Sequence, residues 1–137
     1  MVAPKPTLHI DGIEFSTLEG FFDQVGSRII PDATWGRNLD AFNDILRGGF
    51  GTPEGGFVIH WNNHDVSKRC LGYEETVRQL RKRLARCHPS NVPSVESQLA
   101  AALSHKGSTV FDWLVEIIRV HCTGGEEQED GIELILQ

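Results

Sequence analysis

Two aspartates, Asp40 and Asp44, lie four residues apart in the stretch WGRNLDAFNDIL. At about 100° per residue, Leu39, Phe42 and Leu46 fall in one sector of a helix, and the two aspartates share a neighbouring, exposed sector. Like charges at this spacing destabilise a helix slightly, and only Asp40 is close enough to the helix start to benefit from the dipole. Helix stability therefore does not explain the pair, although a solvated helix face is the simplest alternative.

Paired carboxylates can act as acid and base in a hydrolase when their surroundings separate their pKa values. Asp40 and Asp44 are expected on one exposed face, so we expect no such separation. No GxSxG nucleophile motif is present, and the glycine-rich stretch GGFGTPEGG has neither a Walker lysine nor GxGxxG spacing. An enzyme is therefore the least favoured class, and we expect no cofactor.

The histidines offer a second candidate chemistry. In HWNNH, His60 and His64 have the HxxxH spacing that brings two imidazoles to one metal ion on a helix. However, His60 lies in a predicted strand, and Asn62 replaces the catalytic glutamate of HExxH. Exposed or core histidines are the favoured interpretation, and we predict no metal site.

A basic segment, RQLRKRLAR, is the third candidate. Its bases fall on the helix face opposite Val77, Leu80 and Leu84, as they would on any solvated helix. The segment has no interleaved aromatic residues, and the whole chain carries a net charge of −6, so we do not expect direct nucleic-acid binding. These bases can instead balance the protein's own acidic segments. The bases assigned to that exposed face are Arg78, Arg81, Lys82 and Arg86.

Charge is distributed in blocks along the chain. Residues 1–66 carry four bases and nine acids, residues 67–122 carry nine bases and five acids, and residues 123–137 carry five acids and no base. Acidic ends around a basic middle favour a cationic partner over nucleic acid.

The compartment is predicted from three features. The sequence has no run of about 18 apolar residues, so we expect no membrane span. The start, MVAPKPTLHI, lacks a basic region followed by an apolar one, so we expect no secretory signal. Three cysteines without a CxxC motif indicate reduced, structural thiols. Together these features predict a cytoplasmic protein.

The elements that must position these residues follow from periodicity and capping signals. Few strands among several helices predict an α/β fold of two or three layers. Its helices are expected to pack on a small three-stranded, largely parallel sheet. A chain of 137 residues is expected to form one domain, residues 1–137. The expected elements are an edge strand or hairpin over 8–15, a helix from a Ser16 or Thr17 cap to Gly26 with Glu19 in a capping box, a helix from an Asn38 cap to Gly48 and Gly49, a buried central strand over 57–61, a helix over 73–86, a helix-prone segment or loop over 95–107, a strong helix over 108–122 and a final strand over 132–137.

The stretch around the aspartates resembles the barstar family, small intracellular inhibitors of barnase-type bacterial ribonucleases. The resemblance extends to the strands LHIDG, FVIHW and IELIL and to the first helix, in the same order. Segment 73–107 is longer than the family requires, and we interpret it as an insertion. The family motif, an aromatic residue followed by Gly-x-Asn-Leu-Asp-Ala-Leu-x-Asp, is matched at Trp35, Gly36, Asn38, Leu39, Asp40, Ala41 and Asp44.

The resemblance implies a function and a binding site. The protein would inhibit a microbial ribonuclease of the extracellular type by inserting the second helix and its preceding loop into the active site. Asp40 and Asp44 would replace substrate phosphate, with Asp44 as the expected hot spot. Trp35 would be the aromatic contact, and Gly36 and Asn38 would shape the loop. A monomer in a one-to-one complex, acting as a bacterial antitoxin or immunity protein, is expected.

Departures from the motif change the expected surface. Thr34 and Asn43 replace aromatic residues, and Arg37 and Arg47 flank the aspartates, so RNLDAFNDILR is net neutral. We include Asn43 and Arg47 in the expected partner-binding set, and expect a cognate enzyme related to barnase but different from it. The alternative is a barstar-fold interaction domain whose partner is not a ribonuclease.

Overall fold

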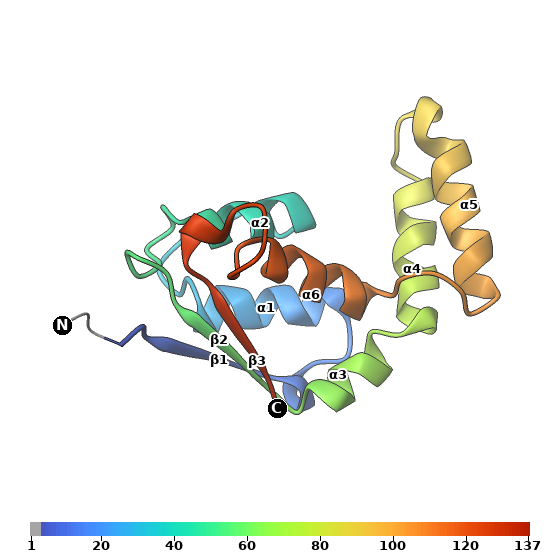
Figure 1. Cartoon of the computed structure of the whole chain (residues 1–137). Helices are drawn as coiled ribbons and strands as arrows, with labels where there is room; N and C mark the ends of the chain where they lie inside the picture. The colour runs from blue at the N-terminus through green and yellow to red at the C-terminus, as the bar shows by residue number, and fades with distance from the viewer. Residues whose placement is uncertain (1–3) are drawn as a thin grey trace.

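Three parallel strands form the sheet in residues 4–137, which the computed structural model describes (Figure 1). They are β1 (Thr7–Asp11), β2 (Val58–Asn62) and β3 (Glu133–Leu136), with β2 in the centre. Ile10 of β1 pairs with Trp61 of β2, which pairs with Leu136 of β3. The predicted sheet is confirmed. Residues 1–3, part of the stretch that carries the signal-peptide expectation, lie outside this range.

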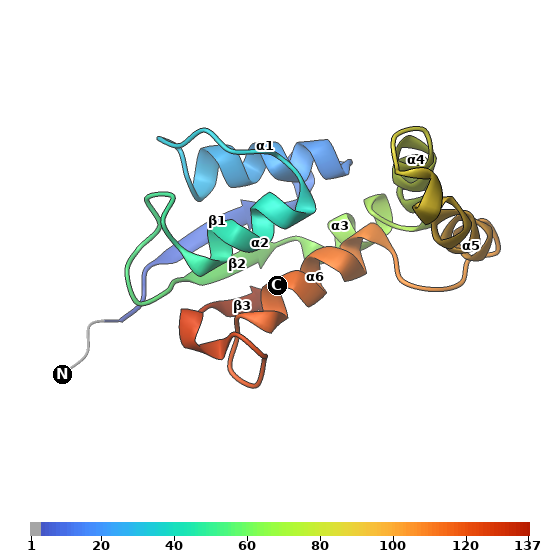
Figure 2. The same ribbon diagram turned by 90° about the horizontal axis from the view of Figure 1, so that it is seen from above.

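Helices cover one face of the sheet, which gives the two-layer form of the predicted α/β fold (Figures 1 and 2). α1, α2 and α6 form this layer, α3 continues from the end of β2, and α4 and α5 form an antiparallel hairpin at one end of the molecule. We call α4 and α5 with their connection the hairpin. The bounds are α1 (Leu18–Arg28), α2 (Leu39–Arg47), α3 (His64–Cys70), α4 (Tyr73–Leu84), α5 (Val92–Leu103) and α6 (Val110–Val120).

Aromatic side chains connect the helical layer to the sheet. Trp61 of β2, Phe21 of α1 and Phe42 of α2 are fully buried. The Phe21 ring lies 5.2 Å from the Trp61 ring and meets the Phe42 ring edge to face at 5.3 Å. Such pairs add about 0.5–1.5 kcal/mol beyond the burial of their apolar area. α2 is therefore held from inside, and its outer face is left for solvent or a partner.

Local capping sets the helix boundaries. Thr17 accepts a hydrogen bond from the Gly20 N–H at 3.1 Å, and Asn38 accepts one from the Ala41 N–H at 2.7 Å. Gly48, with φ 105°, ends α2 as predicted. The expected capping box at Glu19 is wrong, because Thr17 is the cap and Gly20 occupies the box position.

The structure differs from the expected elements in three other places. Of the two N-terminal alternatives, the edge strand is confirmed as β1 and the β-hairpin is wrong, because the residues after β1 form a 3-10 turn, Gly12–Glu14, in which the Asp11 carboxylate accepts the Ile13 N–H at 3.0 Å. α3 was not predicted from the sequence. The segment left open between helix and loop is α5, which starts earlier, at Val92, with a proline in its first turn.

The hairpin has a small apolar cluster of its own. Leu80, Val95 and Ala102 are buried between α4 and α5, and Trp113 of α6 packs against them and against the main core. The cysteines are free thiols. None of the helices in residues 4–137 has the length and apolar character needed to cross a membrane.

Candidate functional site

α2 has one buried and one exposed face, as its periodicity predicts. Phe42, Ile45 and Leu46 are buried in the core, whereas Asp40 and Asp44 are exposed. The two carboxylates therefore come from the same outward face of a helix that is fixed from within.

The two aspartates have different electrostatic surroundings. The Asp44 carboxylate accepts a hydrogen bond from Arg47 Nη1 at 2.8 Å. Arg47 also donates two hydrogen bonds to the Glu127 carboxylate, at 2.7 and 3.1 Å, which lowers the pKa of Glu127 and raises that of Arg47. Asp40 forms no ion pair within residues 4–137. One predicted phosphate mimic is thus partly neutralised, and the other is open.

The loop before α2 is fixed by contacts inside the protein. Trp35 is half-buried, and its ring meets Phe22 of α1 edge to face at 5.4 Å. Arg37 adopts a left-handed conformation, φ 52°, and its guanidinium pairs with Asp23 of α1 at 2.6 Å. Left-handed backbone is uncommon for a residue with a side chain and often occurs at ligand-binding sites. Gly36 allows the close turn, since a Cβ there would lie 3.2 Å from Asn38 Nδ2.

Asn43 is turned toward the protein interior. Its Oδ1 lies 2.6 Å from Nε2 of His121, a fully buried side chain at the end of α6. The other ring nitrogen of His121, Nδ1, lies 2.6 Å from Asp130 Oδ2. The side chains of Asn43 and Arg47 therefore connect α2 to the loop that follows α6.

A metal site is not favoured at this network. Ligand atoms of His121, Glu127 and Asp130 lie within 4.8 Å of one another. Both ring nitrogens of His121 already have protein partners, and Arg47 occupies the Glu127 carboxylate. A cation would have to displace these bonds.

The HxxxH pair does not lie on one helix. His60 is on β2, where its ring lies 5.2 Å from that of His9, and His64 begins α3. Within residues 4–137 these two histidines belong to no cluster of three candidate ligands. The prediction that no metal binds there stays a prediction.

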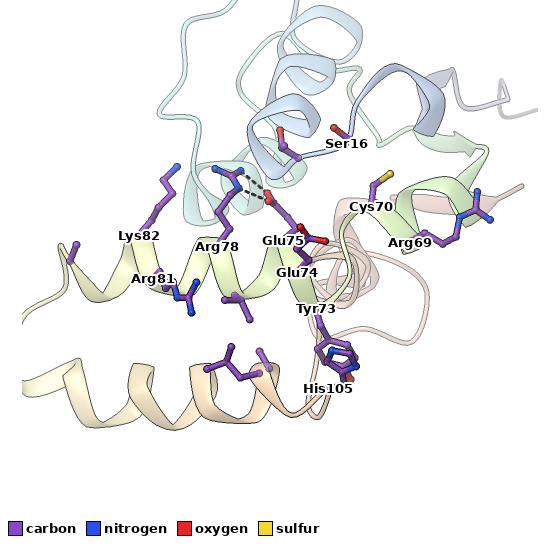
Figure 3. A pocket seen from close by; sticks show the side chains of 15 residues that line it. Ser16, Arg69, Cys70, Tyr73, Glu74, Glu75, Arg78, Arg81, Lys82 and His105 are labelled. Carbon is purple, nitrogen blue, oxygen red and sulfur yellow. Dashed lines mark hydrogen bonds and ion pairs between the residues drawn. The ribbon is translucent and has the colours of Figure 1, made fainter.

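The base of α4 is attached to α1 by a charged network, and Figure 3 shows the part of it in which Arg78 binds Glu75. Arg78 donates to the carboxylates of Glu75 and Glu19, and the buried Glu75 accepts the Leu18 N–H at 2.8 Å. Lys82 reaches Glu19 at 3.1 Å. Arg78 and Lys82 therefore balance the protein's own acids, whereas Arg81 and Arg86 form no ion pair within residues 4–137.

The pKa values of this network follow from two opposing effects. Burial raises the pKa of Glu19, but hydrogen bonds from Arg78, Gln79 and Lys82 outweigh it and lower the pKa to about 2. Burial likewise raises the pKa of Glu75, and bonds from Arg78, the Leu18 N–H and Gln79 lower it below its ordinary value. Both carboxylates are therefore ionised at neutral pH.

Several site residues were missed from the sequence. Apart from the final strand, the sequence indicated only an excess of acids for residues 123–137, yet Glu127 binds Arg47 of α2 and Asp130 lies 2.6 Å from His121. No binding role was predicted for His121, and Glu75 was expected only as part of the helix over 73–86. Their signal is tertiary, since the partners lie far away in the sequence.

The structure is a small α/β fold with the carboxylates of Asp40 and Asp44 on the exposed face of α2. The family model described as "Barstar (barnase inhibitor)" matches residues 5–88, from β1 through α4. This match covers more than half of the chain, so the protein belongs to the barstar family, which is a family of inhibitors and not of enzymes. Among individual curated proteins there is no match.

Proposed function

We propose that this protein inhibits a microbial ribonuclease of the extracellular type by placing α2 and the preceding loop in its active site. The observation that carries the proposal is the shared exposed face of Asp40 and Asp44 on a helix whose other face is packed in the core. A ribonuclease cleft that binds RNA phosphates is cationic, and carboxylates form strong charge-assisted hydrogen bonds with arginine and lysine.

The proposed roles differ among the residues of this surface. Asp44 is the hot spot, Asp40 is the second phosphate mimic, and Trp35 offers the exposed part of its ring. Gly36 and Asn38 shape the loop that brings Trp35 to the partner. The packing of α2 on aromatic rings supports this, because a preorganised surface loses less conformational entropy on binding.

Asn43 and Arg47 support the proposed surface through their contacts within the protein. Arg47 sets the charge that Asp44 presents, and Asn43 fixes α2 against His121. We further propose a cytoplasmic monomer that forms a one-to-one complex, as an immunity protein requires, with no direct contact to nucleic acid or membrane.

A binding experiment tests the proposal. Catalytically inactive bacterial ribonucleases, including those encoded by the source organism, are immobilised, and binding of wild type, Asp44→Ala and Asp40→Ala is measured together with inhibition of the active enzymes. Loss of one partner of a desolvated charge pair costs about 2–5 kcal/mol, so we expect Asp44→Ala to weaken binding by at least about 30-fold, and Asp40→Ala by less.

Glu96→Ala is the matched control, because this acid is exposed on α5 and carries the same charge. It should leave binding unchanged within about twofold. Binding that Asp44→Ala and Glu96→Ala affect equally would contradict the proposal, as would the absence of binding to every ribonuclease tested.

A second candidate is a barstar-fold interaction domain for a partner other than a ribonuclease. The ion pair between Asp44 and Arg47 favours it, because a neutralised carboxylate is a weaker phosphate mimic. In that case, the protein leaves ribonuclease activity unchanged and captures a partner that does not cleave RNA.

A further inference from the structure

A groove of about 590 Å³ lies between α4 and the start of α2. Its apolar lining comes from α1, α2 and α6: Leu18, Phe22, Leu39 and Trp113. Its charged lining has four bases and two acids, namely Arg37, Lys82, Arg83 and Arg86 against Glu19 and Asp40. A basic groove with an apolar lining thus borders the acidic face of α2.

The bases of the groove are not all neutralised by the protein. Lys82 pairs with Glu19 and Arg37 pairs with Asp23. Within residues 4–137, Arg83 and Arg86 pair with no carboxylate. Arg83 lies over the Trp113 ring, 5.4 Å from its centroid, and this cation–π contact holds its charge beside the groove.

Helix stability explains only part of this pattern. Positive charge near the C-terminal end of α4 is favoured by the helix dipole, wherever on the helix circumference it lies. Arg81 is also near this end, but it lines a different groove, and Figure 3 shows it on the side of α4 that faces α5. The dipole therefore does not account for Arg83 and Arg86 on the side that faces α2.

We infer that this groove is the second half of the partner-binding surface and receives an acidic segment of the partner protein. This inference rests on the proposed function. The partner then carries a cationic site for Asp40 and Asp44 and, beside it, an acidic rim with an apolar side chain that enters the groove. The hairpin stands at the end of the molecule where α2 begins, so a protein seated on α2 meets its flank (Figures 1 and 2).

Charge complementarity gives this groove a role in selecting the partner. A ribonuclease with a basic rim would place like charges against Arg83 and Arg86, which costs binding free energy and slows association. The pairing of Asp44 with Arg47 also disfavours such a ribonuclease, because it weakens the attraction of α2 to a uniformly basic surface. The groove therefore favours ribonucleases whose cationic cleft is bordered by acids.

The test uses Arg86→Glu and the ribonuclease that binds wild type in the experiment above. Arg86 is exposed and lies beyond the last residue of α4, so circular dichroism and urea unfolding should match wild type. Arg81→Glu is the control, because it makes the same charge change at an exposed residue of the last turn of α4, outside this groove. We expect Arg86→Glu to weaken binding by about tenfold or more, and Arg81→Glu by less than about threefold. Arg86→Gln, which removes the charge without reversing it, should fall between them.

The outcomes separate this inference from the proposed function. Binding that depends on Asp44 but is equal for Arg86→Glu and Arg81→Glu overturns the inference alone. Binding that Asp44→Ala leaves intact, or no binding to any ribonuclease, overturns the proposed function and this inference with it. A fluorescein-labelled single-stranded RNA provides a further arm, in which we expect no binding. Binding of this RNA that Arg86→Glu abolishes would assign the groove to nucleic acid and overturn the inference.

Discussion

Beneath α2 the protein is held by large buried rings, whereas the buried apolar cluster of the hairpin consists of small and aliphatic side chains. Trp61, Phe21, Phe42 and Phe57 are fully buried in the main core. The buried cluster of the hairpin consists of Leu80, Val95 and Ala102. Because apolar burial contributes about 25 cal/mol per Å², the core under α2 provides most of the packing free energy.

The two regions also differ in what attaches them to the rest of the fold. α2 is attached mainly through apolar packing, which depends little on pH and salt, and its outer side is joined to the loop after α6 by the bonds of Asn43 and Arg47. The base of α4 is attached to α1 through Glu19, Glu75 and Arg78. The acidic half of the proposed binding surface is therefore held mainly by packing, whereas the position of the basic half depends on ionisation.

The largest loss of stability is expected when the buried packing of α2 is removed. Phe42→Ala deletes a fully buried ring that contacts Phe21, and such changes cost about 3–5 kcal/mol. Urea unfolding followed by circular dichroism measures the loss. The control, Leu103→Ala, changes an exposed side chain and should cost less than about 0.5 kcal/mol. Equal costs for the two variants would refute the idea that α2 is held by the core.

Acid should loosen the hairpin before the core. The folded-state pKa values of Glu19 and Glu75 lie below the ordinary value of 4.5, so their contribution to stability is fully present above about pH 4.5. This contribution is lost as the pH falls from about 4.5 toward 2. Water screens the partly exposed Glu19, so we expect a loss of only about 1 kcal/mol.

Hydrogen exchange of backbone amides at pH 6 and pH 3 measures this loosening, after correction for the intrinsic exchange rates. Amides of α4 should lose protection at pH 3, and amides of α2 and β2 should keep it. Glu75→Gln should remove part of the pH dependence, whereas Glu74→Gln, on an exposed neighbour, should not. A core that loses protection together with α4 would show that the two regions are not held separately.

Local signals made much of the fold predictable. The Asn38 cap and Gly48 set both ends of α2, and the β-branched and aromatic run around Trp61 identified the central strand. α3 had no comparable signal, because it is short and its cap residue, Asn63, makes no side-chain capping bond. Asn63 has a left-handed conformation, φ 53°, which no local sequence pattern predicted.

The candidate site was predictable only in its outward part. Helical periodicity was sufficient to predict that Asp40 and Asp44 are exposed. Their surroundings depend on contacts between residues distant in the sequence, such as Asn43 with His121 and Arg47 with Glu127. Such contacts exist only after the chain folds, so the sequence could place Arg47 near Asp44, at i,i+3, but could not predict that Arg47 also binds Glu127. The family match ends at residue 88, inside segment 73–107, so the bounds of the proposed insertion stay a prediction.

The smallest change in stability, and the sharpest test of how the two aspartates differ, comes from Arg47→Ala. Exposed ion pairs contribute little to stability, so urea unfolding should match wild type. The variant frees the Asp44 carboxylate and makes the face of α2 more acidic, so association with a cationic ribonuclease cleft should become several-fold faster at low salt. Lys106→Ala, which removes an exposed base from the loop after α5, should change this rate less. Slower association or faster dissociation of Arg47→Ala would instead mean that Arg47 contacts the partner directly, and that its pairing with Asp44 belongs to the recognised surface.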